Sequence, residues 1–156
     1  MKEMSVQADK EEVEIGGLIA GQVYLISLCT KSQEEKGEVH TIEQSTKPEK
    51  VQDLTASVAQ TSINVAWKPP AVGGCTGFVA TCTSQSSTDT SSATTTKELP
   101  LEETSVMFDD LKENDIYKIE VFTISRNQKS DGCSQSVTMV CTKSMFTFGY
   151  VTFIIM

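Results

Sequence analysis

Apolar and polar residues alternate with a period of two along most of this chain, a pattern typical of β-strands with one buried face. In Ser62–Trp67 the alternation places Ile63, Val65 and Trp67 on one face. No stretch has the period of a helix. The sequence therefore predicts an all-β chain with strands at Glu11–Ile15, Tyr24–Leu28, Val39–Ile42, Val51–Ala56, Ser62–Trp67, Phe78–Cys82, Thr104–Phe108, Tyr117–Ser125 and Ser134–Thr142.

One segment of the sequence recurs 93 positions later. Leu18–Leu28 reappears in pattern as Leu111–Val121, and in both copies a Leu stands six residues before a Tyr that opens an alternating strand. In immunoglobulin-like sandwiches a Tyr at this corner anchors its strand through the hydroxyl group. Because the spacing is close to the length of one such domain, the chain is interpreted as two related modules.

Proline and glycine divide the chain into these modules. Pro48 follows the polar segment Ser45–Lys47, and Pro69-Pro70 ends a strand because proline cannot donate to a β-ladder. Residues 83–96 are rich in Ser and Thr and are expected to form a polar loop or a weak edge strand. We therefore expect an immunoglobulin-like β-sandwich, with a partial module at residues 1–47, a complete module at residues 48–143 and an apolar tail, truncated or artefactual, at residues 144–156.

The second module carries a set of residues at characteristic positions: Pro48, Leu54, Ile63, Val65, Trp67, Pro69, Pro70, Phe78, Leu111, Tyr117 and the closing Cys141-Thr142-Lys143. This set resembles the fibronectin type III module. The resemblance covers residues 48–143 in full, and residues 1–47 are similar to the second half of a preceding module. It implies a scaffolding and binding role, and tandem modules with such a junction look like the ectodomains of receptor-type tyrosine phosphatases and tenascins.

The residues needed for catalysis are scarce. The single histidine, His40, stands in a predicted strand, and no Gly-x-Ser-x-Gly elbow accompanies it. Gly16-Gly17 and Gly73-Gly74 are not followed by a helix, so neither pair is expected to bind phosphate. No Cys-x-x-Cys spacing indicates zinc. We therefore predict no enzymatic activity, no cofactor and no metal site.

The chain is acidic, and its sequence contains no block of basic residues. The formal net charge is −8 at pH 7. A nucleic-acid partner is not expected, because phosphate contacts need a basic surface, and no small-molecule substrate is expected either. Met1–Lys10 lacks the apolar stretch of a secretory signal. An extracellular or cell-surface location is therefore expected only as part of a larger parent protein, with membrane anchoring of that parent left open.

Five cysteines leave the disulfide and oligomeric states undecided. Cys75 and Cys133 both stand near loops at one end of the expected sandwich, so they form a candidate disulfide if the loops bend together. Cys82 and Cys141 are expected on strands about 10 Å apart, which exceeds the roughly 7 Å that a disulfide allows between Cα atoms. Cys82 shares the face of Phe78 and is predicted to be a buried thiol.

Two loops at one end of the sandwich, Pro69–Gly74 and Arg126–Gly132, are the candidate contact surface, because loops on a rigid scaffold often carry binding. The favoured function is a non-enzymatic extracellular adhesion or receptor module that serves as a spacer and a scaffold for an unknown protein ligand. Two alternatives are an ectodomain fragment of a receptor-type protein tyrosine phosphatase, whose catalytic domain lies outside this chain, and an intracellular structural array. The predicted contact residues are Arg126, Asn127, Lys129 and Asp131.

Overall fold

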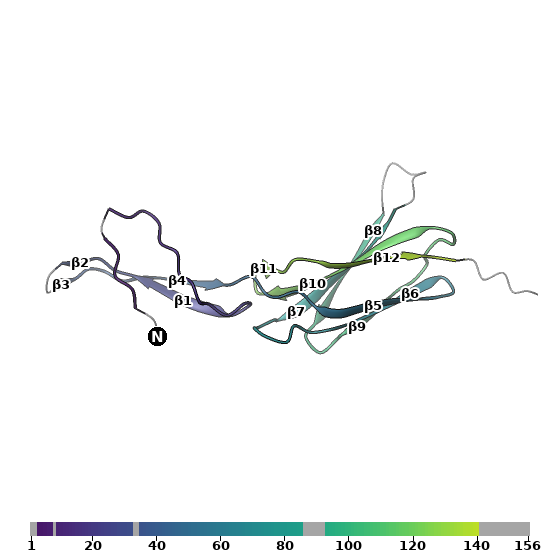
Figure 1. Cartoon of the computed structure of the whole chain (residues 1–156), viewed down its shortest axis with the longest axis horizontal. Helices are drawn as coiled ribbons and strands as arrows, with labels where there is room; N and C mark the ends of the chain where they lie inside the picture. Colours follow the sequence, from purple (N-terminus) through teal and green to yellow (C-terminus); the bar gives the residue numbers. More distant parts are fainter. Residues whose placement is uncertain (1–2, 8, 33–34, 86–92, 141–156) are drawn as a thin grey trace, which may run out of the picture.

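The structure is a computed structural model of the chain, and it describes residues 3–7, 9–32, 35–85 and 93–140. The molecule is elongated, with a short group of strands from the first third of the chain and a two-layered sandwich from the rest lying end to end (Figure 1). All regular elements in the described ranges are β-strands. The prediction of an all-β, immunoglobulin-like sandwich is therefore confirmed.

The sandwich consists of two antiparallel sheets. One sheet has the order β5-β6-β9, formed by Gln52–Ala59, Ser62–Lys68 and Ser105–Phe108. In the other sheet β10 is central and pairs with β7 on one edge and with β11 and β12 on the other, while β8 follows β7. The strands of this second sheet are β7 (Gly77–Ser84), β8 (Thr94–Pro100), β10 (Ile116–Ser125), β11 (Gln128–Lys129) and β12 (Cys133–Thr138).

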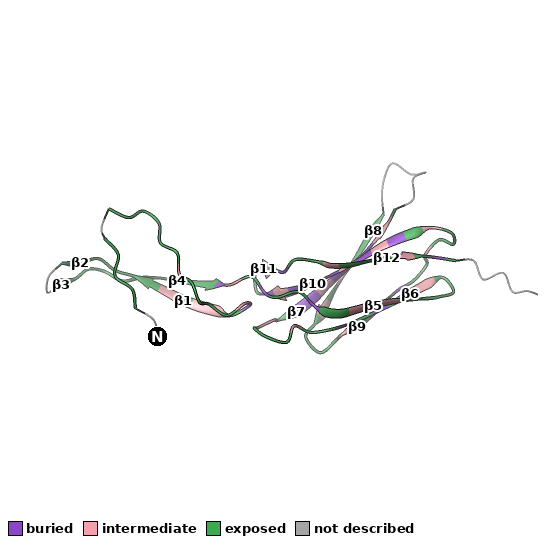
Figure 2. Cartoon of the chain, viewed as in Figure 1, coloured by how far each residue is buried: buried purple, intermediate pink, exposed green. Residues whose placement is uncertain are grey.

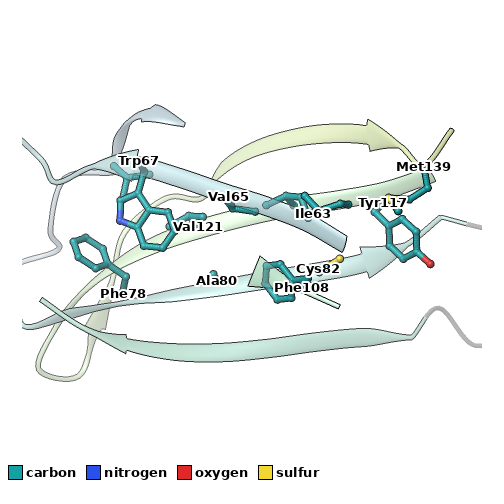
Figure 3. Close-up of a cluster of buried hydrophobic side chains, with 12 residues drawn as sticks. Ile63, Val65, Trp67, Phe78, Ala80, Cys82, Phe108, Tyr117, Val121 and Met139 are labelled. Carbon is teal, nitrogen blue, oxygen red and sulfur yellow. The ribbon is translucent and has the colours of Figure 1, made fainter. Parts of the chain in front are cut away.

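The core lies between the two sheets and follows the alternation in the sequence. Strand β6 buries Ile63, Val65 and Trp67, and β7 buries Phe78 together with its alternate neighbours. The rings of Trp67 and Phe78 meet edge to face, with their centroids 5.5 Å apart (Figure 3). Tyr117 is buried at the other end of this cluster, and Leu111 packs against it from a partly buried position.

Both copies of the predicted tyrosine corner are formed. The hydroxyl oxygen of Tyr24 accepts a hydrogen bond from the Ile19 amide at 2.8 Å, and that of Tyr117 accepts one from the Lys112 amide at 2.9 Å. Each bond spans five residues, so the two copies share one local geometry. Burial raises the pKa of Tyr117, and the hydrogen bond from the Lys112 amide opposes this shift.

The first group of strands is a ribbon built on one antiparallel pair, β1 (Val23–Leu28) and β4 (His40–Ser45), which we call the β1–β4 ribbon. Its hairpin end carries β2 (Lys31–Ser32) and β3 (Glu35–Lys36). Ile26 lies opposite Ile42, so the two side chains share a face with Tyr24 and Leu28. In the described residues no second sheet covers this face, and Leu28 and Ile42 are more than 60% exposed (Figure 2).

Some expectations differ from the structure. Glu11–Ile15 forms no strand. Its counterpart in the sandwich, Ser105–Phe108, pairs with β6. The described residues contain no equivalent of β6 beside the β1–β4 ribbon, so Glu11–Ile15 has no strand to pair with. Of the two structures expected for residues 83–96, the edge strand is formed at their end, since β8 begins at Thr94, pairs with β7 over seven positions and lies at the edge of its sheet. Residues 86–92, Cys141 and the tail at residues 144–156 lie outside the described residues.

Candidate functional site

The two predicted contact loops lie at the end of the sandwich that meets the β1–β4 ribbon (Figure 1). They contact the ribbon and the segments that flank it. We call this contact the junction: residues 20–22 and 43–48 lie on one side of it, and residues 73–74 and 125–131 lie on the other.

Two buried serines form the centre of the junction. The hydroxyl of Ser45, which is 4% exposed, lies 3.1 Å from the Ser125 carbonyl oxygen and 3.1 Å from Asn127 Oδ1, so its single proton is shared between two acceptors. The hydroxyl of Ser125, which is 1% exposed, donates to the Gly21 carbonyl oxygen at 2.6 Å. Buried hydroxyls need such partners, since an unpaired one costs about 1–3 kcal/mol.

Backbones of the two sides approach one another beside the serines. The Gly74 amide donates to the Ala20 carbonyl at 3.0 Å. A Cβ atom at Gly74 would lie 2.7 Å from the Gly21 carbonyl oxygen, and one at Gly73 would lie 2.2 Å from the Ala20 carbonyl oxygen. Gly21 has φ of 65°, and its own Cβ would lie 1.8 Å from the Gly74 carbonyl oxygen. Glycine is therefore required at these positions for the observed contact.

Two ion pairs flank the buried centre. Arg126 pairs with Glu43, and Lys47 Nζ lies 2.7 Å from Asp131 Oδ1. The hydrogen bond from Lys47 lowers the pKa of Asp131. All four side chains are more than two-fifths exposed, so water and salt screen both pairs.

Arg126 has a backbone φ of 50°, in the left-handed region that non-glycine residues rarely occupy. It stands in the tight turn between β10 and β11, where Ser125 pairs with Gln128. Turns of this kind need such an angle to match the twist of their strands. Glycine and asparagine adopt this angle more readily than arginine, but neither could form the ion pair that Arg126 makes with Glu43.

Three of the four predicted contact residues, Arg126, Asn127 and Asp131, meet at the junction, where each contacts the segment 43–47. The side chain of the fourth, Lys129, instead contacts the sandwich itself, with its Nζ 3.6 Å from the centroid of the Phe122 ring. Sequence reasoning named the loop but missed its intrachain partners. The partners Glu43 and Ser45 lie near the end of β4, and Lys47 follows it. Contacts at the end of a strand leave no periodic signal in the sequence. Binding of a separate protein at these residues stays a prediction.

The candidate disulfide is not formed, since Cys75 and Cys133 are both free thiols. Cys133 begins β12 on one edge of β10, whereas Cys75 precedes β7 on the opposite edge. Two ladder spacings, about 10 Å in all, separate β12 from β7, beyond the roughly 7 Å that a disulfide spans. Both cysteines pack against the core instead. Cys82 is buried, and burial raises its pKa to about 11.

The described residues offer little for chemistry. They contain no group of three His, Cys, Asp or Glu side chains able to hold a metal ion. His40 is exposed on β4 and lies opposite Leu28. A hollow of about 250 Å³ lies beside the junction, lined by Lys47, Pro48, Glu49, Lys50 and Asp131. Across the same described ranges, no helix has the length and apolar character needed to cross a membrane.

The comparisons with known proteins agree with this architecture. The family model of the fibronectin type III domain matches residues 48–140, which is more than half of the chain. The chain belongs to the fibronectin type III family. Domains of this family are generally non-catalytic, and they commonly occur in extracellular and cell-surface proteins, including adhesion proteins and receptors. No curated protein sequence matches the chain significantly.

Solved structures of fibronectin type III domains share this fold. A two-domain segment from chicken tenascin has a TM-score of 0.56 at 21% identity, and the match covers 78% of this chain and 67% of that one. The FN1–FN3 domains of chicken CNTN1 give 0.55 at 16% identity, covering 76% and 42%. The FN5 domain of Drosophila Lar gives 0.50 at 21% identity, covering 60% and 97%. The first two matches exceed residues 48–140, so the similarity in fold extends into the preceding strands.

Proposed function

We propose that this chain is a non-enzymatic segment of an extracellular adhesion or receptor protein, in which type III modules act as spacers and as a scaffold for a protein ligand. The observation that carries the proposal is the junction. Buried hydrogen bonds through Ser45 and Ser125 join the β1–β4 ribbon and its flanking segment to the end of the sandwich, and a fixed contact of this kind supports a spacer role.

The second candidate is an intracellular structural array, and the free thiols favour it. Cys29 is exposed, and Cys75 and Cys133 are partly buried without a disulfide. Exposed thiols persist best in a reducing compartment, whereas oxidising compartments favour disulfides. The two candidates therefore differ in the compartment that surrounds Cys29.

Labelling of Cys29 on living cells tests the proposal. The native protein that contains this chain is exposed to a membrane-impermeant maleimide before and after permeabilisation, and labelling at Cys29 is followed by mass spectrometry. A cell-surface protein is labelled on intact cells. Labelling only after permeabilisation would refute the extracellular proposal and support the intracellular array.

Two control measurements make this assignment specific. A Cys29→Ser variant should lose most of the rapid labelling, because Cys82 is buried and burial raises the pKa of its thiol to about 11. Labelling of a known cytosolic thiol protein in the same cells reports leakage of the reagent. Rapid labelling that survives Cys29→Ser would show that another thiol, such as Cys75, carries the signal.

A further inference from the structure

We propose that the loop end of the sandwich is a docking surface for the end of a preceding type III module, and that its glycines and Ser125, rather than its charges, determine which segment can dock. The occupant is present in this chain as residues 20–22 and 43–47. This inference rests on the proposed spacer function, and it adds which residues set the arrangement of the two modules.

The glycine contact is the steric part of this specificity. At Gly74 an added Cβ would meet the Gly21 carbonyl oxygen at 2.7 Å, and backbone atoms cannot move aside as a flexible side chain does. Gly74 has no positive φ, so alanine at this position meets only the steric obstacle. Any segment that docks here must present its own backbone as closely as Ala20-Gly21 does.

The buried serines are the polar part. Ser45 and Ser125 are both less than 5% exposed, and each donates to an acceptor on the other side of the junction. A docking segment without a hydroxyl at the position of Ser45 would leave the carbonyl oxygen of Ser125, a residue only 1% exposed, without this donor. Such a mismatch at a buried acceptor is costly and therefore discriminates between segments.

The charges contribute less to this selection. The Glu43–Arg126 and Lys47–Asp131 pairs are open to solvent, with 83% of the Asp131 side chain exposed. At about 1 M salt the screening length falls to about 3 Å, which suppresses exposed pairs but leaves buried hydrogen bonds intact. Docking that depends on the glycines and serines therefore persists in high salt, whereas docking that depends on the charges does not.

Residual dipolar couplings of the whole chain in a weakly aligning medium test this inference. If the two modules are docked, a single alignment tensor fits the amides of β1, β4, β7 and β10. We expect Gly74→Ala to require two tensors, with that of the β1–β4 ribbon smaller by about twofold or more, because undocked modules move independently. We expect the single tensor to persist at about 1 M NaCl and in the double variant Glu43→Gln with Lys47→Gln.

Matched variants separate docking from folding. Gly16→Ala is the control for Gly74→Ala, since an added Cβ at Gly16 meets nothing within 4 Å. Ser45→Val breaks the polar centre from the ribbon side, so it undocks the modules even if Gly74→Ala were to disturb the sandwich. The Trp67 indole signal reports that the sandwich is folded in every variant.

Three results would overturn the inference. They are two tensors in the unmodified chain, one unchanged tensor in both Gly74→Ala and Ser45→Val, and uncoupling by the charge-neutral variant as large as that by Gly74→Ala. The cell-labelling experiment is independent of all three, so failure of the docking inference is distinguishable from failure of the proposed extracellular function.

Discussion

At the scale of single residues, the interior of the sandwich depends on a few large side chains. Trp67, Phe78 and Phe108 are each less than 5% exposed, and the first two are in direct ring contact. These rings fill the space between the sheets at one end and the middle of the core (Figure 3). Loss of one ring leaves a cavity that the surrounding strands can close only in part.

Trp67→Ala should therefore reduce the free energy of unfolding by about 3–5 kcal/mol. The measurement is urea denaturation followed by circular dichroism, since the substitution removes the single tryptophan. Met107→Ala is the matched control, because Met107 is 47% exposed on β9 and should lose little stability. Equal midpoints for Trp67→Ala and the unmodified chain would contradict the assignment of Trp67 to the core.

Lys47 should control the titration of Asp131. The hydrogen bond from Lys47 lowers the pKa of this carboxyl group, with a smaller contribution from the charge of Lys50. Lys47→Gln should raise the pKa of Asp131 more than Lys50→Gln does, as measured by NMR titration of the carboxyl carbon. Because the pKa is lower in the folded state, the pair stabilises the junction above the unfolded pKa, and this contribution disappears as the pH falls through the folded pKa. A larger effect from Lys50→Gln would show that Lys47 is not its main partner.

At the scale of elements, the two tyrosine corners allow a comparison within one chain. Strand β10 is paired on both edges and covered on one face by the second sheet, whereas β1 is paired with β4 alone in the described residues. The corners themselves are alike, with hydroxyl bonds of 2.8 and 2.9 Å. Any difference in the stability of β1 and β10 therefore comes from pairing and covering.

Amide hydrogen exchange should reveal this difference. We expect Tyr24–Leu28 to exchange faster than Tyr117–Val121 by about tenfold or more, because an uncovered ribbon opens at low energetic cost. Mass spectrometry of peptides from the two segments measures both in one sample. Equal, strong protection would mean that another molecule covers the apolar face of the β1–β4 ribbon.

Much of the element pattern could be predicted because alternation is local. Ser62–Trp67 and Tyr117–Ser125 match β6 and β10 within one residue, and the buried residues are the alternate ones. Strand β8 was harder to predict, because Thr94–Lys97 carries no apolar alternation and takes its structure from pairing with β7. The predicted strand Glu11–Ile15 failed for the opposite reason, since its alternation has no neighbouring strand to pair with.

At the scale of the whole molecule, the loop end could be predicted as a contact region, but its occupant could not. The contacts of Ser125 with Gly21 and of Arg126 with Glu43 join residues more than 80 positions apart. Such contacts depend on how the β1–β4 ribbon and the sandwich meet in space, and a single sequence has no local pattern that records this arrangement. The same holds for the cysteines. Cys75 and Cys133 stay apart because β7 and β12 pair with opposite edges of β10, and the sequence alone does not show this strand order.

A chain that begins at Pro48 should keep most of the stability of the full chain. The buried hydrophobic cluster consists of residues between Val51 and Met139, and none comes from the β1–β4 ribbon. Truncation removes the β1–β4 ribbon, and the sandwich loses only its contacts at the junction, so we expect its free energy of unfolding to fall by no more than about 1–2 kcal/mol. The fluorescence of Trp67 in urea measures this, with Gly74→Ala in the full chain as the comparison. A much larger loss would show that the ribbon supports the sandwich.

The close approach at Gly21, Gly73 and Gly74 also limits how such proteins can change by recombination. Modules of a repeat protein can be duplicated, deleted or exchanged in the genome, and a loose linker would accept any neighbour. Here an exchanged module that brings a bulkier residue at the position of Gly21 would collide with the backbone of the next one. We therefore expect residues 20–22 and 73–74 to be exchanged together, because a change on one side of this contact needs a matching change on the other.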